Sequence, residues 1–225
     1  MGRKKDLLVS ELFYSLQGES SHAGLPCVFI RLQGCNQRCS YCDAAYSYEE
    51  EGQQVSLDKI LTFVKRYKTP LVEITGGEPL LQEGVYPLLK RLVQLQYTTL
   101  IETNGSISIE NVPLEVCVII DIKCPDSGSA TSFLPANLEA IHERQRRDPR
   151  STEIKFVLSS GHDYRWAKKF ITTHGLIDLA PILFSPVVSS FQAPELAKFI
   201  LADQLHVRLQ LQLHTLLWPG QGRGI

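Results

Sequence analysis

The sequence predicts an α/β fold in which parallel strands form a barrel-like sheet with helices outside it. Short apolar runs alternate with amphipathic stretches along the chain, as repeated β–α–β units require. Polar, glycine-containing motifs follow several of these runs, where parallel sheets build their ligand sites. The 225 residues can bury a real core. We expect a single domain over residues 1–225, because no repeat or linker divides them.

The expected elements follow one another in a regular order. Strands are expected at residues 27–32, 71–75, 98–103, 116–122, 153–158, 181–185 and 207–213. Helices are expected at residues 57–67, 86–96, 163–174 and 194–204. Ser56 is a suitable N-cap for the first helix, Pro70 breaks it, and Gly175 closes the third. Residues 116–122 are almost continuously apolar, which is typical of a strand buried on both faces.

Composition and charge exclude several partners. The net charge of −1 gives no global basic field, so we expect neither nucleic acid nor a membrane as partner. No stretch has the roughly 18 apolar residues of a membrane span, and the N-terminus lacks a signal peptide's apolar run. Six cysteines are too sparse for a disulfide scaffold, so a reducing cytoplasm is expected. The local basic run 144–147 is expected to be a solvated helix end.

Three cysteines, Cys35, Cys39 and Cys42, lie within eight residues in a CxxxCxxC spacing. Thiolates this close together can bind one metal centre from a single loop. Structural zinc normally takes four protein ligands, and no second pair lies nearby, since Cys27, Cys117 and Cys124 are scattered. Three thiolates on a 4Fe–4S cluster leave one iron open to a small molecule. The spacing, with Tyr41, resembles the cluster loop of radical S-adenosylmethionine (SAM) enzymes; zinc or a disulfide remain the alternatives.

Two glycine-containing motifs end the strands that follow. In Gly76-Gly77-Glu78-Pro79, glycine lets the backbone approach a ligand, and carbonyls or Glu78 can accept from an ammonium group. A simple tight turn is the other reading. In Glu102-Thr103-Asn104-Gly105, Asn104 either contacts a ligand or caps its own turn.

Charged residues also end or interrupt apolar strands. Lys123 needs an acceptor, which either a carboxylate of the fold or one on a ligand can supply, and we expect the ligand to supply it. Arg31 lies in an apolar strand and requires an anionic partner, for which its planar fork suits a carboxylate. Gln212 and His214 are expected to end the last strand, although His214 alone could be an ordinary edge histidine. Cys124 is expected to be a bystander.

The ordered motifs SLQGE (15–19), Arg31, CxxxCxYCD, TGGEP, ETNG, DIKCP, EIKFVL and LQLQLH resemble the 7-carboxy-7-deazaguanine synthase family. The resemblance runs from about residue 11 to residue 218. It implies an incomplete TIM-type barrel of the radical SAM class. It also implies a lyase that converts 6-carboxy-5,6,7,8-tetrahydropterin into 7-carboxy-7-deazaguanine, with loss of ammonia, for queuosine and other deazapurines.

The resemblance further implies the cofactors and partners. SAM would chelate the open iron, and an electron from flavodoxin or ferredoxin would yield a 5′-deoxyadenosyl radical. That radical would take hydrogen from C6 of the pterin before the ring contracts, and SAM would be regenerated. Family members are usually homodimers and use Mg²⁺.

The resemblance also assigns residues. The iron ligands would be Cys35, Cys39 and Cys42. The SAM-binding residues would be Tyr41, Asp43, Gly77, Glu78, Asn104, Asp121, Lys123 and Ser185. The substrate pocket would contain Leu16, Gln17, Gly18, Glu19, Arg31, Thr75, His214 and Ile225, with Arg31 on the substrate carboxylate.

Two positions depart from the family pattern. Family members commonly have Thr or Ser, which helps to bind Mg²⁺, where this chain has Ala44, whose methyl group cannot ligate a hard cation. Mg²⁺ is then held by Asp43, water and substrate, or is dispensable. Thr215 stands where lysine is frequent, a minor change. The competing hypotheses are another small radical SAM enzyme, such as a glycyl-radical activase, and a zinc-stabilised binding module without turnover.

Overall fold

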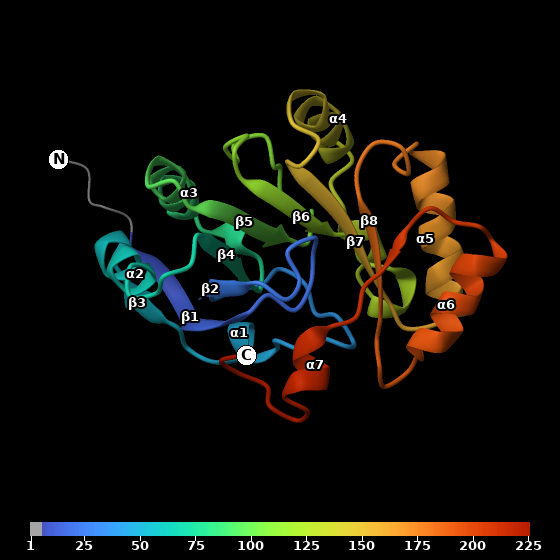
Figure 1. Ribbon diagram of the computed structural model, residues 1–225, viewed down its shortest axis with the longest axis horizontal. Helices are drawn as coiled ribbons and strands as arrows, with labels where there is room; N and C mark the ends of the chain where they lie inside the picture. The colour runs from blue at the N-terminus through green and yellow to red at the C-terminus, as the bar shows by residue number, and fades with distance from the viewer. Residues whose placement is uncertain (1–5) are drawn as a thin grey trace.

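The computed structural model describes residues 6–225, which are built around one curved nine-stranded sheet (Figure 1). Its strand order is β3-β1-β2-β4-β5-β6-β7-β8-β9. The strands are β1 (Leu7–Leu16), β2 (Pro26–Leu32), β3 (Gln53–Val55), β4 (Leu71–Gly76), β5 (Thr98–Thr103), β6 (Cys117–Asp121), β7 (Thr152–Leu158), β8 (Ile182–Pro186) and β9 (Arg208–Leu209). Strand β1 is antiparallel to β2 and β3, and every other neighbouring pair is parallel. The expected α/β fold with an incomplete barrel is confirmed, since the sheet does not close.

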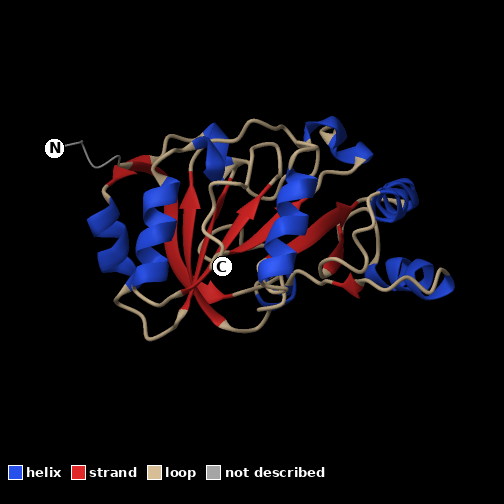
Figure 2. Cartoon of the chain, turned by 90° about the horizontal axis from the view of Figure 1, so that it is seen from above, coloured by secondary structure: helices blue, strands red, loops and turns tan. Residues whose placement is uncertain are grey.

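The helices lie mainly on the outer face of the sheet (Figures 1 and 2). They are α1 (Tyr46–Glu49), α2 (Leu57–Val64), α3 (Val85–Gln94), α4 (Asn137–Arg147), α5 (Gly161–Thr173), α6 (Ala193–Ala202) and α7 (Leu213–Leu217). Ser56 caps α2 as predicted, because its side chain accepts from the backbone N–H of Lys59. Helices α1 and α7 instead lie on the open side of the sheet (Figure 1).

The inner face of the sheet changes from apolar to charged along the strands. Near the strand starts, a buried cluster fills the interior; it comprises Phe13, Cys27, Phe29, Leu71, Leu100, Cys117 and Ile119. Successive side chains of a strand alternate between faces, so the next inward residues lie one layer nearer the carboxyl ends. In β2 and β4 the register pairs Phe29 with Glu73 and Arg31 with Thr75. The charged residues therefore form a layer at the carboxyl edge of the sheet, where the sequence motifs lie.

The predicted strand at 207–213 is present but much shorter than expected. Only Arg208 and Leu209 pair with β8, and α7 begins at Leu213. The backbone N–H of Gln210 still bonds the carbonyl of Phe184 at 2.9 Å, but that of Leu213 bonds the carbonyl of Gly18 at 3.1 Å. The chain thus leaves the sheet edge and contacts the loop after β1, so His214 lies on α7. Strands β1 and β3 and helices α1 and α7 were not predicted, and of α4 only the C-terminal end at 144–147 was expected.

The basic run 144–147 was predicted to be solvated, and half of it is not. Arg144 is 3% exposed and donates to the carbonyls of Val112 at 3.0 Å and Val116 at 2.5 Å. Buried Gln145 donates to the carbonyl of Thr152 at 2.8 Å. These bonds join α4 to the starts of β6 and β7, because backbone carbonyls there need donors. The other two arginines of the run are exposed.

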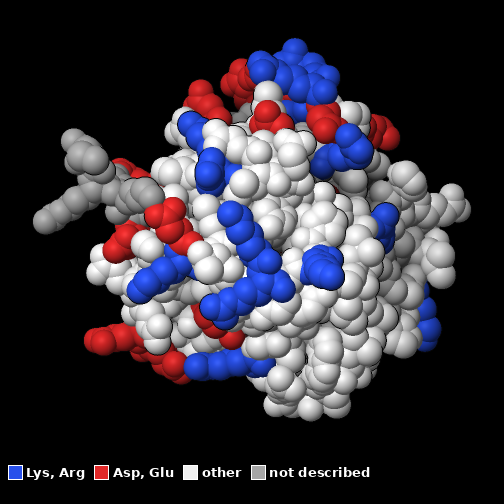
Figure 3. Space-filling view, turned by 60° about the vertical axis from the view of Figure 1, so that its left-hand side comes forward, with Lys and Arg blue, Asp and Glu red and all other residues white. Residues whose placement is uncertain are grey.

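No helix of residues 6–225 is both long and apolar enough to span a membrane. On the face shown in Figure 3, lysine and arginine side chains form short groups with acidic side chains beside them. Neither charge sign covers that face uniformly, in keeping with the net charge of −1.

Candidate active site

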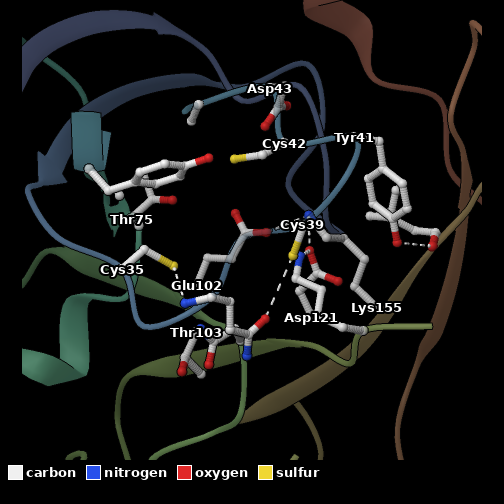
Figure 4. Close-up of a pocket in the computed structure, with 18 of the residues that line it drawn as sticks. Cys35, Cys39, Tyr41, Cys42, Asp43, Thr75, Glu102, Thr103, Asp121 and Lys155 are labelled. Atoms are coloured by element: carbon white, nitrogen blue, oxygen red, sulfur yellow. Dashed lines mark hydrogen bonds and ion pairs between the residues drawn. The ribbon is translucent and has the colours of Figure 1, made fainter. Parts of the chain in front are cut away.

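The predicted cysteine motif forms a loop between β2 and α1 at the carboxyl edge of the sheet. Cys35, Cys39 and Cys42 all line one cavity, which we call the cysteine cavity (Figure 4). The loop turns where the N–H of Cys42 bonds the carbonyl of Cys39 at 3.2 Å. It is tied to the turn that follows β6 by the N–H of Ser40, which bonds the carbonyl of Ser127 at 3.1 Å. One short loop therefore presents three sulfur atoms to one space.

The donor set fits an iron–sulfur cluster. Burial raises the pKa of the Cys35 and Cys42 thiols, so a positively charged metal centre is needed to hold them as thiolates at neutral pH. The other three cysteines are buried and line neither this cavity nor its neighbour described below; they are Cys27, Cys117 and Cys124. No fourth sulfur is supplied there, which leaves one iron of a 4Fe–4S cluster open.

Glycine is required where β4 meets the cysteine loop. Gly76 has φ +144°, and a Cβ on it would lie 2.2 Å from the carbonyl oxygen of Leu32. A Cβ on Gly77 would lie 2.3 Å from the carbonyl oxygen of Gly34 and 2.6 Å from the Cβ of Cys35. The two backbones therefore approach each other as closely as hydrogen-only side chains allow.

Replacing Gly77 by alanine is expected to push the cysteine loop off β4. We expect a loss of about 1–3 kcal/mol in the free energy of unfolding, because the clash is with backbone. Iron retained per chain after anaerobic reconstitution should fall as well. Gly161→Ala is the matched control, since its Cβ would meet nothing nearer than 3.4 Å. Equal iron content in the two variants would contradict this role for Gly77.

Glu78 does not line the cysteine cavity, contrary to the reading of its carboxylate as an ammonium acceptor. It is fully buried, and its carboxylate accepts from the backbone N–H groups of Leu80 at 2.9 Å and Asn104 at 2.7 Å. The Thr103 hydroxyl donates to it at 2.9 Å. Burial raises the pKa of Glu78, although these three donors oppose the rise. Glu78 thus joins β4 to the end of β5, and the glycine carbonyls remain the candidate acceptors.

The remaining predicted SAM residues divide into two groups. The following line the cysteine cavity: Tyr41, Asp43, Gly77, Asn104, Asp121 and Lys123. Ser185 does not line it and is fully buried on β8. Two oxygens of this set, Asp121 Oδ1 and Ser185 Oγ, are buried without a hydrogen-bond partner among the described residues. Because Asp121 lines the cavity, its unpartnered oxygen suits a ligand that carries a hydroxyl or amino group.

Lys123 finds its acceptor within the fold. Its Nζ lies 2.8 Å from Asp121 Oδ2, the first of the two alternatives left by the sequence. Burial alone would lower the pKa of Lys123, but the Asp121 carboxylate raises it, so the amine stays charged. The Tyr41 hydroxyl donates to the carbonyl of Val157 at 3.0 Å, which fixes the loop against β7.

A second cavity adjoins the first, and we call it the C-terminal cavity because residues 214–225 form one wall. All eight predicted substrate residues line it: Leu16, Gln17, Gly18, Glu19, Arg31, Thr75, His214 and Ile225. The two cavities share a wall made of Arg31, Asp43, Ala44, Thr75 and Glu102. Molecules in the two cavities would therefore both contact these five residues.

Arg31 is the cation of the shared wall. Its Nε donates to Glu11 at 2.8 Å, and its guanidinium lies over the rings of Phe13 and Tyr46, 5.6 and 5.8 Å from their centres. These contacts hold the planar group while its two terminal nitrogens make no hydrogen bond within the described residues. Arg31 can therefore offer two parallel donors to a carboxylate.

The charged network behind both cavities was largely missed by the sequence reading. Lys155 is 4% exposed and contacts Glu19 at 2.6 Å, Asp121 at 3.5 Å and Glu102 more closely still. Glu73 lies in the same interior and lines the C-terminal cavity. The available signal was a lysine or glutamate inside otherwise apolar strands, which is costly unless the group is paired or functional.

Of the three carboxylates that contact Lys155, two ionise more readily than usual and one less readily. Burial alone would raise the pKa values of Glu19 and Asp121, but the neighbouring lysines lower both below their ordinary values. For Glu102, burial prevails over Lys155 and raises the pKa. Carboxyl groups with lowered and with raised pKa values therefore lie side by side in this network, as is common in binding sites.

Known proteins resemble this chain over its whole length. A family model of the radical SAM superfamily matches residues 29–114. The 7-carboxy-7-deazaguanine synthase of Chlorobaculum tepidum is 43% identical over 100% of both chains. That of Koribacter versatilis is 41% identical, covering 96% of this chain and 99% of its own. The crystal structure of QueE from Escherichia coli matches in fold, with a TM-score of 0.74 at 24% identity, covering 92% of this chain and 94% of its own.

Proposed function

Because the chain belongs to the 7-carboxy-7-deazaguanine synthase family, we propose that it converts 6-carboxy-5,6,7,8-tetrahydropterin into 7-carboxy-7-deazaguanine. The reaction is a radical SAM lyase step that releases ammonia on the route to queuosine and related deazapurines. The observation that carries the proposal is the wall shared by the two cavities. It puts a three-cysteine site and an arginine-lined pocket in contact, as transfer of a hydrogen atom requires.

Cys35, Cys39 and Cys42 hold the 4Fe–4S cluster, and the residues around them hold SAM. When bound, the cluster and SAM would supply radical hydrogen-abstraction chemistry to the substrate. Asp121 Oδ1, which lines the cysteine cavity and has no partner among the described residues, offers an acceptor for a hydroxyl or amino group of SAM. The carbonyls at Gly76 and Gly77 accept from its ammonium group. This chain's contribution is orientation and the exclusion of water.

The C-terminal cavity takes the pterin. Arg31 pairs with the substrate carboxylate, while Gln17 and Glu19 contact the ring from the loop after β1. His214 and Ile225 cover the pocket from the C-terminal segment. Residues from both ends of the chain thus meet at one site, which favours one catalytic domain over residues 1–225.

Magnesium binding is weakened by Ala44. This residue lies in the shared wall beside Asp43, where its methyl group offers no ligand. We expect removal of Mg²⁺ to change kcat/KM by less than about threefold, equivalent to under 1 kcal/mol. Ala44→Thr should make turnover clearly more responsive to Mg²⁺, whereas the neighbouring control Ala45→Thr should not. Strong Mg²⁺ dependence of the unaltered enzyme would contradict this account of Ala44.

The proposal also includes an electron donor and a second copy of the chain. A small acidic electron carrier, flavodoxin or ferredoxin, reduces the cluster. The enzyme works as a homodimer in the reducing cytoplasm, since an iron–sulfur site partly open to solvent needs such a compartment.

Anaerobic turnover tests the proposed function. The reconstituted protein is given SAM, dithionite and 6-carboxytetrahydropterin, and the expected product is 7-carboxy-7-deazaguanine. If SAM is cleaved to 5′-deoxyadenosine without a deazapurine, another radical SAM activity, such as glycyl-radical activation of a partner protein, replaces this one. If the protein is colourless, binds zinc and shows no turnover, both radical SAM activities are excluded.

A further inference from the structure

The C-terminal cavity is lined by a carboxyl group that has no role in the function proposed above. Glu73 lies in the middle of β4, is 3% exposed, and lines the cavity together with Phe29 and Ile119. Its Oε2 accepts a hydrogen bond from the Gln17 side chain. No hydrogen bond within residues 6–225 engages its Oε1. A nearly buried oxygen thus borders the pocket without a partner, which points to a ligand.

The charges around Glu73 leave it without a cation. Four interior carboxylates face two lysines; the carboxylates belong to Glu19, Glu73, Glu102 and Asp121. Lys155 forms ion pairs with the other three and Lys123 with Asp121, and within the described residues no cation lies at ion-pair distance from Glu73. An unpaired buried carboxyl is held in its neutral form.

The neighbouring groups agree with a neutral Glu73. Burial, followed by the negative charges of Glu102 and Glu19, raises the pKa of Glu73 well above its usual range. Lys155 and the Gln17 hydrogen bond oppose this rise without reversing it. Two further titratable groups, the thiols of Cys27 and Cys117, are near enough for their own pKa values to be raised by Glu73, and neither supplies a positive charge.

We propose that Glu73, as a neutral carboxylic acid, is a specificity-determining residue that binds the lactam edge of the substrate, where C4=O stands beside N3–H. The inference rests on the proposed pterin substrate. With Oε2 fixed as an acceptor by Gln17, the acid proton resides on Oε1. The Oε1–H can then donate to C4=O, and the second lone pair of Oε2 can accept from N3–H.

The spacing of the strands supports this placement. Arg31 pairs in register with Thr75, one inward position beyond Glu73 on β4. Two residues along a strand span about 7 Å, a separation that a bicyclic ring bridges. A pterin whose carboxylate lies on Arg31 would therefore bring its far edge to Glu73, and the apolar side chains of Phe29 and Ile119 would contact its ring.

A binding measurement with two ligands tests the proposal. The probes are 6-carboxypterin and its N3-methyl derivative, which cannot donate from N3, and their Kd values are read from pterin fluorescence on SAM-loaded, reconstituted enzyme. The proteins are the unaltered enzyme, Glu73→Gln and Glu73→Leu. The control is Glu153→Gln, which changes a buried acid of β7 that lines neither cavity and bonds the N–H of Ser21.

N-methylation should weaken binding about tenfold or more in the unaltered enzyme, Glu73→Gln and Glu153→Gln, because it leaves a buried polar group unpaired. An amide retains both hydrogen bonds of a neutral acid, so Glu73→Gln should resemble the unaltered enzyme. In Glu73→Leu the methylation penalty should fall below about threefold, as coupling between contacting groups requires. A purely structural role for Glu73 would not change this ratio.

Two results would overturn the assignment. Equal methylation penalties in all four proteins would show that Glu73 does not contact N3. Loss of the penalty in Glu73→Gln as well would show that an ionised carboxylate binds the ligand. The proposed function fails separately, if the unaltered enzyme binds 6-carboxypterin yet forms no deazapurine in the turnover assay.

Discussion

Cys39→Ala is expected to abolish both the iron–sulfur cluster and product formation. Two remaining thiols cannot hold three irons of a 4Fe–4S cluster, and the described residues that line the cysteine cavity include no fourth cysteine. After anaerobic reconstitution, the variant should lose the broad absorption near 400 nm that is typical of such clusters and retain only background iron. Deazapurine formation and 5′-deoxyadenosine release should both fall to background.

Cysteine replacements in the core provide the matched controls. Cys117→Ala and Cys124→Ala remove buried thiols that lie outside both cavities, and burial raises the pKa of the Cys117 thiol to about 12, so it stays protonated. Each should cost about 1 kcal/mol of stability while the cluster and turnover persist. A brown, active Cys39→Ala protein, or a colourless Cys124→Ala protein, would contradict the ligand assignment.

Lys155→Met is expected to destabilise the protein by about 3–5 kcal/mol at neutral pH, as removal of one partner from a buried ion pair does. The substitution leaves three carboxylates close together in the barrel interior without their shared cation. Substrate binding should weaken too, because Glu19 and Glu102 line the C-terminal cavity. Denaturant unfolding and the KM for the pterin measure the two effects.

The stability lost in Lys155→Met is expected to depend on pH. Burial would raise the pKa of Glu19, but Lys155 lowers it below 4.5, so the resulting stability is present above pH 4.5 and lost as pH falls further. Without Lys155 burial prevails, the folded pKa rises, and protonation relieves the repulsion. The stability difference between the two proteins should therefore be largest near pH 7–8 and shrink below about pH 5.

An exposed ion pair is the control for Lys155. Lys168 lies 2.8 Å from Asp203, and both side chains are more than 30% exposed. Lys168→Met should cost less than about 1 kcal/mol at any of these pH values. Comparable losses of stability in the two variants would indicate that the ion pairs of Lys155 contribute no more than an exposed ion pair does.

The sequence predicted the parallel part of the sheet because its strands are buried on both faces and read as continuous apolar runs. Strand β1 was missed because it is antiparallel and partly exposed, with a mixed burial pattern. The alternation at 207–213 predicted a strand, yet β9 has a neighbour on one side only. The competing bond from Leu213 to Gly18 ends it early. Edge pairing depends on distant residues, which periodicity does not reveal.

The candidate site was predictable where motifs follow strand ends, since such loops share one edge. Glu78 was misjudged because its neighbours supply three donors that spacing alone does not reveal. Glu73 and Lys155 were missed because they lie within strands, where the sequence shows a charged residue but not its partners. Those partners come from three other segments of the chain: the loop after β1, β5 and β6.

An anaerobic crystal structure of the reconstituted enzyme with SAM and 6-carboxypterin tests the central claim most directly. We expect iron bound to Cys35, Cys39 and Cys42, and SAM in the cysteine cavity. The pterin should occupy the C-terminal cavity with its carboxylate on the terminal nitrogens of Arg31. The two ligands should meet at the shared wall. A pterin bound elsewhere, or separated from SAM by protein, would contradict the account.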